Sequence, residues 1–194
     1  MRLFHFSDDP NIKRFVPRPV LVPTERPAGQ EWLNGPLVWA VSEFYQANYL
    51  FPRDCPRILL WLDDDTTPED RKLWWGTRDC RTIAHIEWDW FERVRDGVLY
   101  RYEFSVDLFE RLSNSMWIAR TEAEVIARET IDSLPEALRE HGAELRIMHS
   151  LTALLDVWSN TSLAVSGIRL HHAKDWPADR WVKVLGNSTL GKNR

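Results

Sequence analysis

The sequence predicts a single α+β domain, because short apolar runs typical of strands alternate with short helical segments in no regular βαβ rhythm. With 194 residues, the chain is long enough to bury a substantial core. Strands are expected over residues 3–7, 37–41, 57–62, 81–88, 98–104, 115–119, 122–127, 144–148 and 166–171. Helices or helical turns are expected over residues 43–49, 89–97, 133–141 and 150–158, and from residue 68 onward. We expect the domain to cover residues 1–185 and residues 186–194 to form a flexible tail.

Composition restricts the class of protein and its partners. The net charge of −4 argues against an extended nucleic-acid surface, which needs clustered positive charge. Cys55 and Cys80 lack C-x-x-C spacing and are expected to be free thiols of a cytoplasmic protein. No stretch has the length and apolarity of a membrane span. We therefore expect a cytoplasmic protein with a small-molecule partner, and the oligomeric state stays open.

The first predicted strand combines core residues with polar ones. Because side chains alternate along a strand, Phe4 and Phe6 share one face, and His5 and Ser7 share the other. The phenylalanines indicate a core face. His5 and Ser7 either point together into a cleft, or His5 is a structural histidine that bonds a backbone carbonyl.

Local signals mark loops and helix ends. Prolines are dense over residues 17–36, which predicts a long irregular loop and a candidate lid over the cleft. Thr67, followed by a proline and acids, predicts a helix start. Ser133 and Glu136 form a capping-box pattern, and Gly142 is expected just after the end of that helix.

The segment Pro52-Arg-Asp-Cys-Pro-Arg57 has two interpretations. Arg53 and Arg57 could bind a phosphate and lower the pKa of Cys55, which would make it a nucleophile. Alternatively, the segment is a structural turn between a helix and a buried strand, which is the interpretation we favour. No metal site is expected, because the adjacent His171 and His172 would point to opposite faces of a strand.

Two groups of motifs resemble known families. His5-Phe6-Ser7 with Ile12, the Pro52–Arg57 segment and Ser166-Gly-Ile-Arg-Leu170 together resemble an uncharacterised bacterial family, over most of the chain. A second resemblance is to ADP-ribosyltransferase-like folds. It rests on His5-Phe6-Ser7, Val38-Trp39-Ala40, Ala47-Asn48-Tyr49 and Ala123-Glu124-Val125-Ile126, which occur in the order of that family's motifs.

The second resemblance implies two small, mostly antiparallel sheets over a cleft that takes NAD as a substrate. It implies that His5 and Ser7 anchor the dinucleotide and that Trp39 or Tyr49 stacks on its nicotinamide ring. Arg18, or alternatively Arg14, is then expected to meet the pyrophosphate.

The implied reaction is transfer or cleavage of ribose at the glycosidic bond, with Glu124 and His5 as catalytic residues. A carboxylate beside the ribose stabilises the developing oxocarbenium charge. Other carboxylates stay open as candidates for that role: Glu87, Glu103, Glu122 and Glu129. The competing function is a non-enzymatic ligand-binding or interaction module, which needs the aromatic and polar walls of the cleft but no carboxylate at the ribose.

Overall fold

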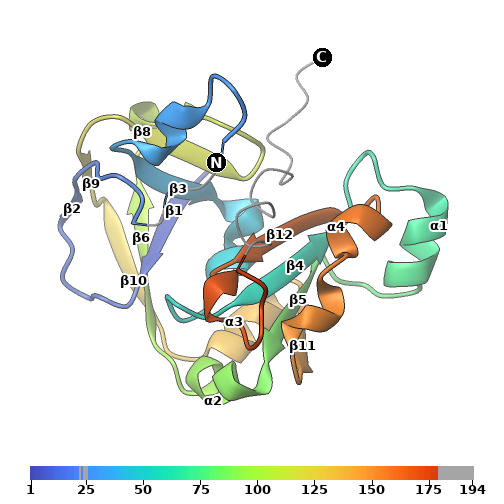
Figure 1. Cartoon of the computed structure of the whole chain (residues 1–194). Coiled ribbons are helices and arrows are strands. Elements are labelled where there is room, and N and C mark those ends of the chain that lie inside the picture. Colours follow the sequence, from blue (N-terminus) through green and yellow to red (C-terminus); the bar gives the residue numbers. More distant parts are fainter. Residues whose placement is uncertain (22, 24–25, 179–194) are drawn as a thin grey trace.

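The computed structural model describes residues 1–21, 23 and 26–178, and Figure 1 shows their arrangement. The predicted domain boundary at residue 185 and the predicted tail over residues 186–194 lie outside the described residues. The α+β class is confirmed: short helices accompany small sheets whose strand pairs are mostly antiparallel.

The first sheet has six strands in the order β10-β6-β1-β3-β8-β7, and all neighbouring pairs are antiparallel. Its strands are β1 (Leu3–Ser7), β3 (Val38–Ser42), β6 (Leu99–Phe104), β7 (Glu110–Arg111), β8 (Met116–Ala119) and β10 (Ala127–Ile131). A separate two-stranded pair consists of β2 (Arg14–Phe15) and β9 (Ala123–Glu124). β1 lies in the interior of the six-stranded sheet, between β3 and β6.

The second sheet has four strands in the order β11-β5-β4-β12. Its strands are β4 (Arg57–Trp61), β5 (Thr82–Glu87), β11 (Ala143–Met148) and β12 (Ala164–Ile168). The β5–β11 pair is parallel, and the other pairs are antiparallel. Figure 1 shows this sheet beside the first one, with α2 and α3 next to each other at its end.

The helices are short. The α-helices are α1 (Pro68–Asp70), α2 (Trp88–Arg95), α3 (Leu134–Glu140) and α4 (Val157–Asn160), and α1 continues into a π-helix (Arg71–Trp75). The 3-10 helices span Glu31–Asn34, Glu43–Tyr49, Val106–Leu108, Leu151–Leu154 and Leu170–His172.

A shared core joins the two sheets. It contains Leu59, Ala84 and Ile86 from the second sheet, together with Leu99 and Ile131 from the first. Side chains of α2 and α3 close this core on one side. Phe4 is buried as predicted, and Phe6 is half-buried and packs against the shared core.

Some predicted elements are wrong in their extent. The strand predicted over residues 122–127 is divided into β9 and β10, and β10 continues to Ile131. The charged, exposed residues of this edge strand conceal the apolar alternation on which the prediction depended. The last predicted strand, over residues 166–171, ends at Ile168 because Arg169 adopts a left-handed conformation with φ 56°.

The helix-end predictions have mixed outcomes. The Thr67 side chain accepts a hydrogen bond from the Asp70 amide at 3.2 Å, so the predicted cap is confirmed. Gly142 has φ 73°, as expected just after a helix end. The capping box at Ser133 is wrong, since its side chain makes no capping hydrogen bond. Pro135 removes one of the amides that such a cap would use.

Candidate ligand-binding cavity

The two sheets meet at a cavity of about 380 Å³, a volume within the range of small-molecule sites. The first sheet contributes His5, Phe6, Ser7, Val38, Trp39 and Leu99 to its lining. The second sheet and the residue after it contribute Arg57, Ile168 and Arg169. Strand β2 contributes Phe15, and the 3-10 helix before β4 contributes Tyr49. Loops contribute Asp8, Val16, Arg18, Pro19, Val20, Leu21, Leu37, Phe51 and Arg53.

Five residues predicted from the sequence to bind a cofactor line this one cavity: His5, Ser7, Arg18, Trp39 and Tyr49. Arg14, the predicted alternative to Arg18, does not line it and pairs with Glu122. The proline-rich segment supplies one wall through residues 16–21. That segment is not wholly irregular, because it contains the 3-10 helix Glu31–Asn34, and Arg18 forms a β-bridge with Leu37.

His5 is held in one tautomer. Its Nδ1 lies 2.8 Å from the carbonyl oxygen of Trp39, and since a carbonyl only accepts, Nδ1 carries the hydrogen and donates. Burial lowers the pKa of His5, and the nearby charges of Arg18 and Arg53 lower it further. At neutral pH the imidazole is therefore uncharged, and its Nε2 lone pair is an acceptor that has no partner among the described residues.

Ser7 is buried at the end of β1, and its Oγ accepts a hydrogen bond from the Asp9 amide at 3.1 Å. The hydroxyl hydrogen remains to be donated. Tyr49 donates its hydroxyl to the sulfur of Met116 at 3.2 Å, which leaves its ring as the part available to a ligand. The indole N–H of Trp39 is buried and has no acceptor within the described part of the chain.

Arg57 is the most deeply buried cation of the cavity wall, with only 4% of its surface exposed. Its Nε donates to the carbonyl of Asn48 and its Nη1 to the carbonyl of Cys55, both at 2.9 Å. The guanidinium lies over the Phe51 ring, 5.0 Å from the centroid. Burial lowers the pKa of Arg57 to about 10. Within the described residues, no carboxylate oxygen lies within 4.0 Å of this guanidinium.

Three further arginines make the cavity strongly cationic. Arg18 and Arg53 are exposed at its rim, and neither has an ion pair with a described carboxylate. Arg169 lies 3.9 Å from a carboxylate oxygen of Asp54. Asp8 is the one acidic residue among the described residues of the lining. The positive charge of the wall therefore far exceeds its negative charge, which favours an anionic ligand.

The Pro52–Arg57 segment is a turn, as we favoured, since the Cys55 amide bonds the carbonyl of Pro52 at 3.0 Å. Burial raises the pKa of the Cys55 thiol to about 12, so a thiolate nucleophile is disfavoured. The turn nevertheless places Arg53 and Arg57 in the cavity wall. The structural-turn interpretation is therefore confirmed, and the binding of a phosphate by these arginines stays a prediction.

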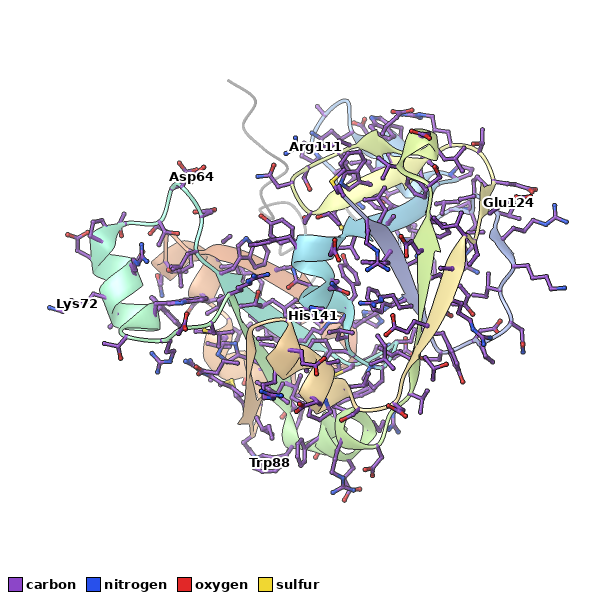
Figure 2. All side chains as sticks on the ribbon, turned by 180° about the vertical axis from the view of Figure 1, so that it is seen from behind. Asp64, Lys72, Trp88, Arg111, Glu124 and His141 are labelled. Atoms are coloured by element: carbon purple, nitrogen blue, oxygen red, sulfur yellow. The ribbon has the colours of Figure 1, made fainter. Side chains whose placement is uncertain are left out.

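Glu124 does not line the cavity. It is exposed on β9, opposite Arg14 of β2, and Figure 2 shows it at the outer edge of the molecule. The alternative carboxylates also lie elsewhere and have other partners. Glu122 pairs with Arg14, Glu103 with Arg2, Glu129 with Arg101, and Glu87 with backbone amides. The structure therefore brings the predicted binding residues together but not the predicted catalytic carboxylate.

Sequence reasoning missed Arg169 and Asp8. Asp8 directly follows β1, but the alternation of that strand assigns it to the face of Phe4 and Phe6, so strand periodicity did not identify it. Arg169 has no local signal, because its place in the wall depends on how the second sheet meets the first.

Among the described residues, no group of three or more His, Cys, Asp or Glu side chains has an arrangement suited to a metal ion. Likewise, none of the helices in the described part has the length and apolar character that crossing a membrane requires.

These features define a two-sheet α+β protein with a cationic, partly aromatic cavity at the junction of its sheets. The chain belongs to DUF6886, a family of unknown function whose model matches residues 4–173. Comparison with curated proteins and with solved structures gave no match.

Proposed function

We propose that this protein binds a small nucleotide-like molecule, meaning a sugar phosphate with or without a base, in the cavity between its sheets. The observation that carries the proposal is the set of side chains that line this cavity. Four arginines, a neutral histidine and aromatic rings line one cavity of about 380 Å³. Such a combination suits a ligand that has an anionic end, hydroxyl groups and a flat ring.

His5 and Ser7 are suited to the hydroxyl groups of a sugar. The Nε2 lone pair of His5 accepts a hydrogen bond, because Nδ1 is committed to the Trp39 carbonyl. The Ser7 hydroxyl donates, because its oxygen already accepts from the Asp9 amide. A ribose presents neighbouring hydroxyls that both donate and accept, so one acceptor and one donor on the same strand match it.

The aromatic and aliphatic part of the wall is suited to a base. Trp39 and Tyr49 contribute rings. On the loop side, Val16 and Leu21 line the cavity while 55% and 77% of their surfaces are exposed. A planar base that covers these side chains removes apolar surface from water, which stabilises the complex.

The proposal is for binding rather than for ribosyl transfer. Cleavage of a glycosidic bond needs a carboxylate beside the ribose, and Glu124, which was predicted for that role, lies on the outer edge of the molecule. Asp8, the one acidic residue of the described lining, is exposed and directly follows β1. We therefore retain the ligand-binding module and treat NAD as one candidate ligand among nucleotides.

Isothermal titration calorimetry with adenosine monophosphate (AMP) and with NAD tests the proposal. We expect the wild type to bind at least one of them, and His5→Ala to weaken that binding at least about tenfold, the effect of losing roughly one hydrogen bond. His149→Ala is the matched control, because His149 is exposed and does not line the cavity. Circular dichroism establishes that each variant is folded. Absence of binding of both nucleotides to the wild type would overturn the proposal.

A further inference from the structure

We propose that the cavity selects ligands that end in a phosphate monoester, with the terminal phosphate held by Arg57 at the inner end of the cavity. This inference rests on the proposed function and specifies its ligand class. It favours mononucleotides and sugar phosphates over dinucleotides such as NAD, in which the phosphates form a bridge.

Arg57 is a buried cation that has no described carboxylate partner. A guanidinium that is 96% buried needs a compensating anion, because removing a charge from water is costly. No described carboxylate lies within 4.0 Å of it. Its two hydrogen bonds to the carbonyls of Asn48 and Cys55 occupy Nε and one side of Nη1. Nη2 and the remaining Nη1 hydrogen are left for an anion in the cavity.

Positive charges outnumber negative ones among the described residues that line the cavity. Arg57, Arg53, Arg18 and Arg169 all line it, against Asp8 alone among the described acids. A phosphate monoester carries a charge of about −1.5 to −2 at pH 7 and has three terminal acceptor oxygens. A diester or each phosphate of a pyrophosphate bridge has a single negative charge on two terminal oxygens. The monoester therefore compensates more of the arginine charge at one point.

The lining around Arg57 is buried. Phe51, Arg57 and Leu99 are among the buried residues of the lining, with exposures of 2%, 4% and 1%. Arg18, Arg53 and Leu21 are exposed at the rim. A group that reaches Arg57 is enclosed by buried side chains, so it suits the end of a ligand. A bridging phosphate must continue in two directions, which an enclosed end does not permit.

The arginines are also held in position before a ligand arrives. Arg57 is fixed by two carbonyls that belong to the turn and helix directly before β4. Arg169 is oriented by Asp54 and by a left-handed backbone conformation that is uncommon for residues other than glycine. Such preorganisation reduces the entropy cost of binding.

The ligand test compares four probes by calorimetry: AMP, the methyl ester of its 5′-phosphate, adenosine and NAD. The methyl ester differs from AMP by one methyl group on the phosphate and carries one charge fewer. We expect AMP to bind at least about tenfold more tightly than each of the others. Equal affinity for AMP and its methyl ester, or tighter binding of NAD, would overturn this inference and leave the proposed function standing. Failure of all four to bind would overturn the proposed function itself.

The protein test uses one variant at the exposed Arg53 and one at the buried Arg57, and circular dichroism establishes that each is folded. We expect Arg53→Gln to weaken AMP binding at least about fivefold and to leave adenosine binding unchanged. Arg71→Gln is the matched control, because Arg71 is exposed on the π-helix and does not line the cavity. Arg57→Lys keeps a buried charge but loses the fork of donors, so AMP affinity is expected to fall more than in Arg53→Gln. Unchanged AMP affinity in both cavity variants would contradict the inference.

Discussion

Cys55 belongs to the turn that places Arg53 and Arg57 in the cavity wall, with its thiol completely buried and its pKa raised to about 12 by burial. We predict that it does not react with a thiol reagent in the native protein at pH 8, because the thiolate is the reactive form. The Cys80→Ser variant leaves Cys55 as the single thiol of the chain. Ellman's reagent should therefore give no signal with this variant until urea unfolds it. Rapid reaction of the native variant would show that Cys55 is accessible and ionised.

His85, on β5, makes folding stability depend on pH. It is buried, its Nδ1 donates to the Ile58 carbonyl at 3.2 Å, and burial lowers its pKa to about 4. The unfolded chain binds a proton near pH 6.5, whereas the folded chain does so only near pH 4. Stability is therefore complete above pH 6.5 and is lost as the pH falls from 6.5 to 4, by about 3 kcal/mol.

Urea unfolding between pH 7 and pH 4.5 measures this effect. His85→Gln should lose less stability over that range than the wild type, and His149→Gln, at an exposed position, should behave like the wild type. The pKa of His5 is lowered too, so some pH dependence should persist in His85→Gln. Identical slopes for wild type and His85→Gln would show that His85 titrates normally in the folded state.

At the scale of single residues, the sequence predicted cavity-lining side chains where the alternation along one strand was sufficient. The alternation along residues 3–7 placed His5 and Ser7 on one face, and both line the cavity. The same reasoning could not distinguish a structural histidine from a ligand-binding one. In the structure one ring nitrogen of His5 bonds a backbone carbonyl, which is the structural role, and the binding of a ligand by the other nitrogen stays a prediction.

At the scale of elements, Glu87 ties the end of β5 to two later segments. Its buried carboxylate accepts hydrogen bonds from the Leu151 amide at 2.9 Å and from the Lys174 amide at 3.0 and 3.2 Å. These bonds fix the start of the 3-10 helix Leu151–Leu154 and the segment after β12. Sequence reasoning offered Glu87 as a catalytic candidate, whereas the structure gives it these backbone partners.

We predict that Glu87→Gln lowers the free energy of unfolding by about 2 kcal/mol, since hydrogen bonds to a charged group contribute more than neutral ones. The glutamine side chain also replaces one carboxylate oxygen with an NH₂ group, which cannot accept a hydrogen bond from a backbone N–H. Urea unfolding measures the loss, and hydrogen exchange at Leu151 and Lys174 should become faster. Glu92→Gln is the control, because Glu92 is exposed on α2 and should change stability by less than about 0.5 kcal/mol. Equal stability of Glu87→Gln and wild type would show that solvent replaces the carboxylate.

Element boundaries were predictable where a local residue sets them and not elsewhere. Thr67 and Gly142 act within one turn of chain, and both were identified from the sequence. The division of residues 122–127 into β9 and β10 depends on which partner strand each half meets, β2 or β6. That choice is made by long-range packing, which apolar periodicity does not report.

At the scale of the whole molecule, the cavity lies where both sheets contribute side chains, so a bound ligand connects them. The clustering of Arg53, Arg57 and Arg169 with Arg18 follows from this junction and could not be derived from spacing alone. It arises because β4 and the end of β12 meet the end of β1, and these segments are far apart in the sequence.

We predict that AMP raises the midpoint of thermal unfolding. At a hundredfold excess over Kd, a ligand that binds only the folded state contributes about 2.7 kcal/mol, which is roughly 5–10 °C for a domain of this size. Scanning fluorimetry measures the shift. Adenosine at the same concentration should give a much smaller one. Equal shifts from AMP and adenosine would mean that the phosphate adds nothing to binding.

The most direct test of the central claim is nitrogen-15 NMR of the side chains while AMP is added. In assigned spectra, the chemical shifts of arginine Nε–H and tryptophan indole groups reflect the surroundings of these side chains in the cavity. We predict that the signals of Arg57 and Trp39, which line the cavity, shift on addition of AMP. The indole signals of Trp158 and Trp176, in a separate core cluster, should stay in place. Shifts confined to residues outside the cavity, or none at saturating AMP, would contradict the account.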